Sequence, residues 1–236
     1  AAAKAVQRVV NGQNSSGGFS YNLKPTTRND TSYMAWCAQA IVAAKLTGLS
    51  VQVTGLDRCI AKAAEGFGMN YGEKDGSGSF GYTGPGRSRW GLTGAGTLCL
   101  QILGASRSNE CRGGIAGLEE SQFKWKEPGF GSFLYYTYYA SQAKFHAGGA
   151  AWWRWSQELS RELVGNQRVT RMESSTYTDG EGRQHAVGSW RSPAKREHGF
   201  GVVMDTALCT MMLEAYYRHI PVCRNPEAYP VWKGAS

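Results

Sequence analysis

The sequence is poor in several kinds of residue, and each shortage excludes a class of protein. Only 19% of its 236 residues are charged, 7 are proline and 42% are hydrophobic, a balance typical of packed globular chains rather than disordered ones. No stretch of about 18 apolar residues occurs, so we expect no transmembrane helix. None of the six cysteines forms a C-x-x-C pair, which excludes zinc-ribbon and redox motifs of that type.

The basic residues are scattered along the chain, although the formal net charge is +8. Arg28, Arg58, Arg112 and Arg154 stand far apart, and no run of five basic residues occurs. Nucleic-acid binding usually requires a clustered basic surface, whereas a net charge of this size is ordinary for solubility. We therefore expect no nucleic-acid partner.

The first residues lack the long apolar core of a signal peptide and resemble the middle of a helix. We interpret residues 1–236 as a single domain that is a piece of a longer protein. An export signal could then have been removed with the rest, so the sequence leaves the compartment open.

The clearest signal is a fourfold internal repeat. Four apolar segments align over 35–41, 97–103, 138–144 and 207–213, and three of them have cysteine at the third position. Each follows a Gly-rich stretch that ends in an aromatic residue: Phe19, Phe80, Phe133 or Trp190. Glycine permits left-handed backbone and close approach at a corner, so we expect each aromatic side chain to fold under the end of a helix layer.

Two kinds of helix alternate with these stretches. Residues 31–46, 92–103 and 205–217 are apolar on nearly all sides, as buried helices are, and Asp30 and Asp205 stand where N-caps are expected. Residues 56–64 and 151–163 have one apolar face, and Thr54 and Asp57 are spaced as a capping box for the first of them. The alternation predicts an all-α fold of about four pairs, each an outer helix, a Gly-aromatic turn and an inner helix.

The stretch from Gln13 to Phe19 resembles the Q-x-x-x-G-x-W repeat of squalene and oxidosqualene cyclases, with Phe in place of Trp. Gln167, with the later Gly188-Ser189-Trp190, is similar to a second copy opened by an insertion. Residues 135–167 and 205–218 are similar to bacterial proteins with prenyltransferase/squalene-oxidase repeats. The resemblance implies an α/α toroid, partial or complete, of the terpenoid-cyclase and protein-prenyltransferase superfamily, and it is compatible with an exported bacterial protein.

The catalytic motifs of that superfamily are missing. Neither the D-x-D-D acid of class II cyclases nor the D-C-T-A-E of oxidosqualene cyclases occurs. Protein prenyltransferases hold zinc with an Asp-x-Cys pair, but Asp30 and Asp205 are followed at that position by Ser32 and Ala207. We therefore expect neither a metal nor another cofactor, and the sequence identifies no catalytic residue.

The predicted inner helices carry a set of polar and aromatic residues typical of a wall around an apolar ligand. Gln39, Gln101 and Gln142 hold one register on three of these helices. The residues that we predict to bind a ligand are Trp36, Gln39, Gln101, Tyr135, Tyr139, Gln142 and His146. An equally weighted interpretation is that these residues fill the core. We also expect Trp36 and Cys99 to be buried on inner helices, and we expect Trp36→Ala to lower the free energy of unfolding by roughly 3–5 kcal/mol.

The segment 167–203 has no helical periodicity and is predicted to be a long insertion loop, a kind of segment that is often functional. Two functions follow from these features. The first is a binding domain, without the known catalytic residues, for an apolar small molecule or a protein partner. The alternative is a cyclase-like or transferase-like enzyme that acts on an isoprenoid-like substrate through another site, so the sequence leaves open whether the chain is an enzyme.

Overall fold

The computed structural model describes residues 1–86, 90–119, 121–128, 132–170, 176–194 and 201–215. The described part of the chain is mostly helical, with 59% of its residues in helices, as the repeat pattern predicts. The α-helices are α1 (Ala2–Asn11), α2 (Thr31–Leu46), α3 (Leu56–Gly68), α4 (Trp90–Ile102), α5 (Asn109–Glu119), α6 (Phe133–Ala147), α7 (Gly149–Gly165) and α8 (Gly201–Glu214). The strands are β1 (Tyr71–Lys74), β2 (Ser77–Phe80), β3 (Arg168–Thr170), β4 (Thr176–Thr178) and β5 (Gln184–Ser189), and short 3-10 helices cover Tyr21–Leu23 and Leu49–Gln52.

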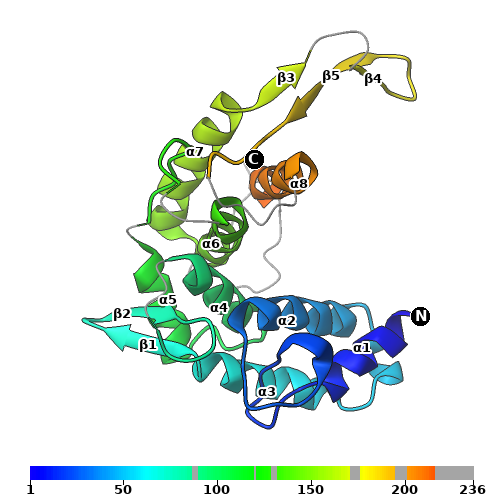
Figure 1. Cartoon of the computed structure of the whole chain (residues 1–236), viewed down its shortest axis with the longest axis vertical. Helices are drawn as coiled ribbons and strands as arrows, with labels where there is room; N and C mark the ends of the chain where they lie inside the picture. The colour runs from blue at the N-terminus through cyan, green and yellow to red at the C-terminus, as the bar shows by residue number, and fades with distance from the viewer. Residues whose placement is uncertain (87–89, 120, 129–131, 171–175, 195–200, 216–236) are drawn as a thin grey trace, which may run out of the picture.

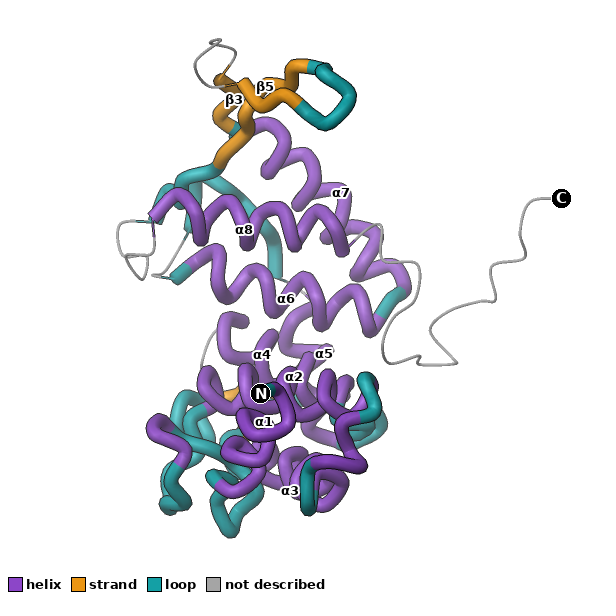
Figure 2. The backbone as a smooth tube through the Cα atoms, turned by 90° about the vertical axis from the view of Figure 1, so that its right-hand side faces the viewer, coloured by secondary structure: helices purple, strands orange, loops and turns teal. Residues whose placement is uncertain are grey.

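The helices alternate along the chain between an inner and an outer layer of an open arc (Figure 1). On the concave side α2, α4, α6 and α8 pack against one another in that order, and α3, α5 and α7 each contact the inner helix before and after them. Figure 2 shows α6 and α8 side by side in the upper part of the arc. One hydrophobic core runs between the two layers, because the inner helices are apolar on most sides and the outer helices on one.

Helix α2 begins and ends at the residues that the sequence predicts. The Asp30 Oδ1 atom accepts a hydrogen bond from the Tyr33 backbone N–H at 3.1 Å, as an N-cap does. The same expectation is wrong for Asp205, because α8 already begins at Gly201 and the Asp205 carboxylate accepts from the Ser192 N–H at 2.8 Å. It is also wrong for Thr54, since the N-cap of α3 is Gly55 and no side chain caps that helix.

The Gly-aromatic stretches place all four aromatic side chains inside the core. Their exposed fractions are 1%, 0%, 1% and 4% for Phe19, Phe80, Phe133 and Trp190, which confirms the expectation that they fold under the layers. Glycine is required around Phe80, because a Cβ atom built on Gly96 of α4 would overlap its ring.

The residues around the second Gly-aromatic stretch form a β-hairpin. Strands β1 and β2 pair antiparallel, and Asp75 and Gly76 connect them with φ values of 55° and 74°. Positive φ at both central residues is the geometry that Asp-Gly favours in two-residue hairpins.

The prediction of an irregular insertion loop over 167–203 is wrong for the part of that segment that the structure describes. Strands β3, β5 and β4 form an antiparallel sheet in that order, at the end of the arc beyond α7 and α8 (Figures 1 and 2). The strands have only three to six residues each, and most of their side chains are exposed. Such short segments give too little alternation to be distinguished from a polar loop in the sequence.

Helices α4 and α6 approach each other closely because α4 is built from small residues. A Cβ atom on Gly94 would lie 2.6 Å from the backbone nitrogen of Ala140, well inside van der Waals contact. The absence of a side chain at Gly94 therefore sets the distance between these two inner helices.

We expect Gly94→Ala to lower the free energy of unfolding by at least about 1 kcal/mol, because the added methyl group must push α6 away from α4. Denaturant titration followed by circular dichroism measures the loss. Gly165→Ala, in the last turn of α7, is the matched control, since no atom lies within 4 Å of a Cβ there and alanine is the better helix former. Equal stability of the two variants would contradict this account of the α4–α6 contact.

Candidate ligand-binding surface

The small residues of α4 also bring the aromatic residues of α6 and α2 together. A Cβ atom on Gly91 would lie 2.8 Å from the Tyr136 ring, so this ring lies directly against the α4 backbone. Across α4, the Trp36 ring of α2 lies 6.3 Å from Tyr135 and 6.2 Å from Tyr139, measured between centroids. These distances are within the range of favourable aromatic pairs.

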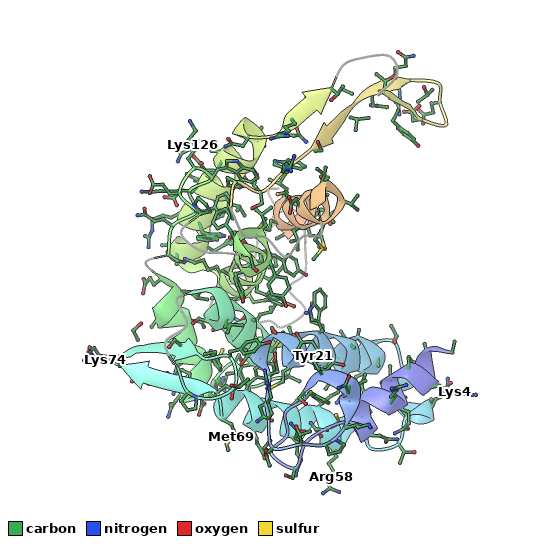
Figure 3. All side chains as sticks on the ribbon, viewed as in Figure 1. Lys4, Tyr21, Arg58, Met69, Lys74 and Lys126 are labelled. Atoms are coloured by element: carbon green, nitrogen blue, oxygen red, sulfur yellow. The ribbon has the colours of Figure 1, made fainter. Side chains whose placement is uncertain are left out.

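Residues from two loops extend this group of rings. The Tyr21 ring lies 4.7 Å from the Tyr33 ring of α2, measured between centroids, with the two planes tilted by 40°, and Figure 3 shows Tyr21 beside α2. Tyr82 follows β2, and burial together with the neighbouring Asp30 and Tyr21 raises the pKa of Tyr82 to about 12. We define the aromatic surface as Tyr21, Tyr33, Trp36, Tyr82, Tyr135, Tyr136 and Tyr139.

Part of this aromatic surface is open to solvent. Tyr21, Trp36 and Tyr82 are 55%, 47% and 43% exposed, whereas Tyr139 is fully buried beneath the others. The prediction that Trp36 is buried is therefore wrong, while the prediction for Cys99 is confirmed, with no exposed area. The reason is the position of Trp36 on the concave side of α2, where an apolar residue of an inner helix faces the opening of the arc instead of another helix.

The polar groups of the surface are mostly engaged within the protein. Asp30 is fully buried, and its carboxylate accepts from Ser32 Oγ at 2.8 Å, from the Tyr33 N–H and from Arg28 at 3.4 Å. It thus acts as a cap and an anchor for the tyrosines. Burial raises the pKa of Tyr135 to about 12, although hydrogen bonds to Tyr139 and Trp36 oppose the rise, so the hydroxyl is neutral near pH 7.

The structure brings together four of the seven predicted ligand-binding residues. Trp36, Tyr135 and Tyr139 share the aromatic surface, and the Gln39 amide donates to the Tyr139 hydroxyl at 3.3 Å. Gln39 is half-buried, so it lies at the boundary between this surface and the core.

The other three predicted residues lie in the core instead. Gln101, Gln142 and His146 are 3%, 2% and 6% exposed, and the Gln101 amide donates to the Ala143 carbonyl at 3.1 Å. The His146 ring packs 5.5 Å from Phe145. The prediction that these three residues belong to the ligand wall is not supported by their burial, because a buried amide in a repeat register also serves to join helices.

Tyr21, Tyr82, Tyr136 and Tyr33 belong to the aromatic surface but not to the set of residues that the sequence predicts to bind a ligand. Tyr21 begins a short 3-10 helix and Tyr82 belongs to a loop, so neither has an α-helical register and their approach to α2 depends on the path of the chain. Tyr136 had a local signal, since it precedes Tyr138 and Tyr139 in an aromatic-rich helix.

Comparison with known proteins identified no relative of this chain: no family model, no curated protein and no solved structure matches it. Within the described residues, no group of three or more histidine, cysteine, aspartate or glutamate side chains could hold a metal ion. None of the helices in the described ranges is long and apolar enough to cross a membrane. The function must therefore be argued from the geometry of the surface itself.

Proposed function

We propose that the chain is a repeat domain of the squalene-cyclase and prenyltransferase type that binds an apolar, isoprenoid-like ligand on its aromatic surface. The observation that carries the proposal is the convergence of seven aromatic side chains from two helices and two loops, three of them substantially exposed. Large aromatic residues clustered in water are uncommon on a surface without a partner. A flexible hydrocarbon could cover them and gain about 25 cal/mol for each Å² of apolar area removed from water.

The arrangement of the helices supports the same proposal. Four outer–inner pairs in one arc are what a segment of an α/α toroid would contain, and the ligand-binding wall of such a ring is formed by its inner helices. Trp36, Tyr135 and Tyr139 all belong to the inner helices α2 and α6.

The alternative of an enzyme with a cyclase-like reaction is less well supported by this geometry. Such a reaction needs an acid directed at the substrate, and Asp30, which is next to the rings, is already occupied by several donors. The alternative stays a prediction from the resemblance.

We expect farnesol to bind the purified protein and Trp36→Ala to weaken that binding at least about tenfold, because an exposed tryptophan at the centre of a contact commonly dominates affinity. Equilibrium dialysis with radiolabelled farnesol measures the dissociation constants. Trp153→Ala is the matched control, since Trp153 of α7 is 55% exposed and lies outside the aromatic surface.

Unchanged farnesol binding in Trp36→Ala would show that the ligand lies elsewhere. No binding of farnesol, with a protein partner captured by the native chain and lost in Trp36→Ala, would assign the surface to a protein instead.

A further inference from the structure

A second site lies on the convex side of the arc, away from the aromatic surface. A cavity of about 810 Å³ is bordered by the β1–β2 turn, by α5 and by α7, which lie together on the outer side in Figure 1. Its charged lining residues include Glu119, Lys144, Arg154 and Glu158. Cavities of this size accommodate small molecules.

Lys144 is the unexpected member of this lining. It belongs to the inner helix α6, and the equivalent positions of the other repeats are occupied by Ile41, Leu103 and Leu213. Lys144 is only 5% exposed, whereas lysine is almost never fully buried without a partner. The repeat thus has an amine where packing alone would favour an apolar side chain.

The Lys144 amine has a cation–π contact and one weak hydrogen bond among the described residues. Nζ lies 4.7 Å from the centroid of the Trp155 ring, and its one hydrogen bond among the described residues is a long contact of 3.5 Å to the Glu119 carbonyl. Burial and the nearby Arg154 guanidinium lower the pKa of Lys144 to about 8, while Glu119 and Glu158 oppose this change. A substantial fraction of the amine is therefore neutral near pH 8.

Lys144 also lines a neighbouring cavity of about 140 Å³ whose other walls are mostly apolar, including Ile115, Leu118 and Ala143. The amine thus stands between an open polar cavity and a small apolar one, beside the face of Trp155. This environment suits a small molecule with an apolar body and a polar reactive group.

We propose that Lys144 is a nucleophilic amine that forms a Schiff base with a small aldehyde bound in the cavity on the convex side of the arc. Desolvation and a neighbouring cation are the two means by which proteins activate lysine for this reaction.

The reaction needs no oxidant, reductant or further reactant. The Nζ lone pair forms a bond to the carbonyl carbon while the carbonyl π electrons move to oxygen, which takes up a proton. The resulting carbinolamine loses that oxygen as water, and nitrogen and carbon become doubly bonded. Glu119 and Glu158 line the same cavity and can carry the protons that move between nitrogen and oxygen.

The test is reductive trapping with 2-naphthaldehyde. Native protein is incubated with the aldehyde at pH 8, reduced with sodium borohydride and mapped by peptide mass spectrometry. We expect Lys144 to be modified at least about tenfold faster than the exposed Lys4 and Lys45 in the same sample, with a half-maximal rate near pH 8. In Lys144→Leu the fast adduct should vanish while the slow adducts are unchanged.

Modification of Lys144 at the rate of the exposed lysines, or none at all, would overturn the proposal. Lys144→Leu should leave farnesol binding unchanged, so the farnesol measurement distinguishes the Lys144 site from the aromatic surface.

Discussion

Phe80→Ala is expected to lower the free energy of unfolding by roughly 3–5 kcal/mol, because it removes a fully buried ring from a site that cannot collapse. The ring has no exposed area, packs 5.3 Å from Tyr71 and lies against Gly96 and Gly114. The two glycines have no side chains that could move into the space that is left. Denaturant unfolding measures the change, and the slope of the transition shows whether it stays two-state.

Trp36→Ala should cost less than Phe80→Ala, although it removes a larger ring, because Trp36 belongs to the partly exposed aromatic surface. Because nearly half of Trp36 is exposed in the folded protein, we expect a loss below about 2 kcal/mol, in place of the 3–5 kcal/mol expected of a buried tryptophan. A larger loss for Trp36→Ala than for Phe80→Ala would contradict both the burial of the Gly-aromatic turn and the exposure of the aromatic surface.

Lys144→Leu is expected to stabilise the protein by on the order of 2 kcal/mol at pH 7, which is the opposite of what most core substitutions do. It replaces a buried amine with the residue found at the same position in two other repeats, Leu103 and Leu213. Replacement of buried charged groups by apolar ones of similar volume is often favourable.

The pH dependence distinguishes this cause from better packing. Burial lowers the pKa of Lys144 to about 8, from 10.5, so the unfolded chain binds more protons than the folded protein between these two pH values. The native protein therefore gains stability as the pH rises from 8 to 10.5, and below pH 8 it carries the whole penalty. The advantage of Lys144→Leu should be greatest at or below pH 7 and should largely disappear by pH 10.5.

Unfolding free energies of both proteins at pH 7 and pH 10 measure this effect. Lys4→Leu is a suitable control because Lys4 is exposed on α1. An advantage of Lys144→Leu that does not change with pH would assign the gain to packing. A loss of stability would show that the Trp155 and Glu119 contacts outweigh the cost of burying the amine.

A nucleophilic role for Lys144 would explain why a stabilising leucine is not found at this position. Proteins commonly lose some stability at functional sites, where groups are held in environments that do not favour them. The stability measurement and the trapping experiment therefore address one residue from two independent directions.

The helices and their buried faces were largely predictable because they depend on local patterns. The range of α2 and its Asp30 cap follow from an apolar run and a capping residue beside it. The one-sided pattern of α7 likewise predicts the burial of Trp152, Trp155, Leu159 and Leu163. These features need only the 3.6-residue period and the chemistry of a helix end.

The sequence predictions were wrong where the pattern of residues was short, and where the exposure of a side chain depended on its position in the arc. The strands of the sheet formed by β3, β5 and β4 are too short to be distinguished by alternation, and Asp205 stands one turn inside α8 because the helix extends back to Gly201. Local propensity does not fix the ends of elements to within a few residues.

The sequence by itself determined that the chain forms helix pairs, which residues of each pair turn inward, and that four aromatic residues seal the layers. Only the tertiary structure decided which inward residues are covered, because an open arc leaves the concave side of α2 in contact with water. Trp36 and Cys37 are neighbours on the same apolar helix, yet they are 47% and 5% exposed. The difference arises from packing partners distant in the sequence: the α6 rings of Tyr135 and Tyr139 cover Trp36 only in part, and no local pattern encodes that geometry.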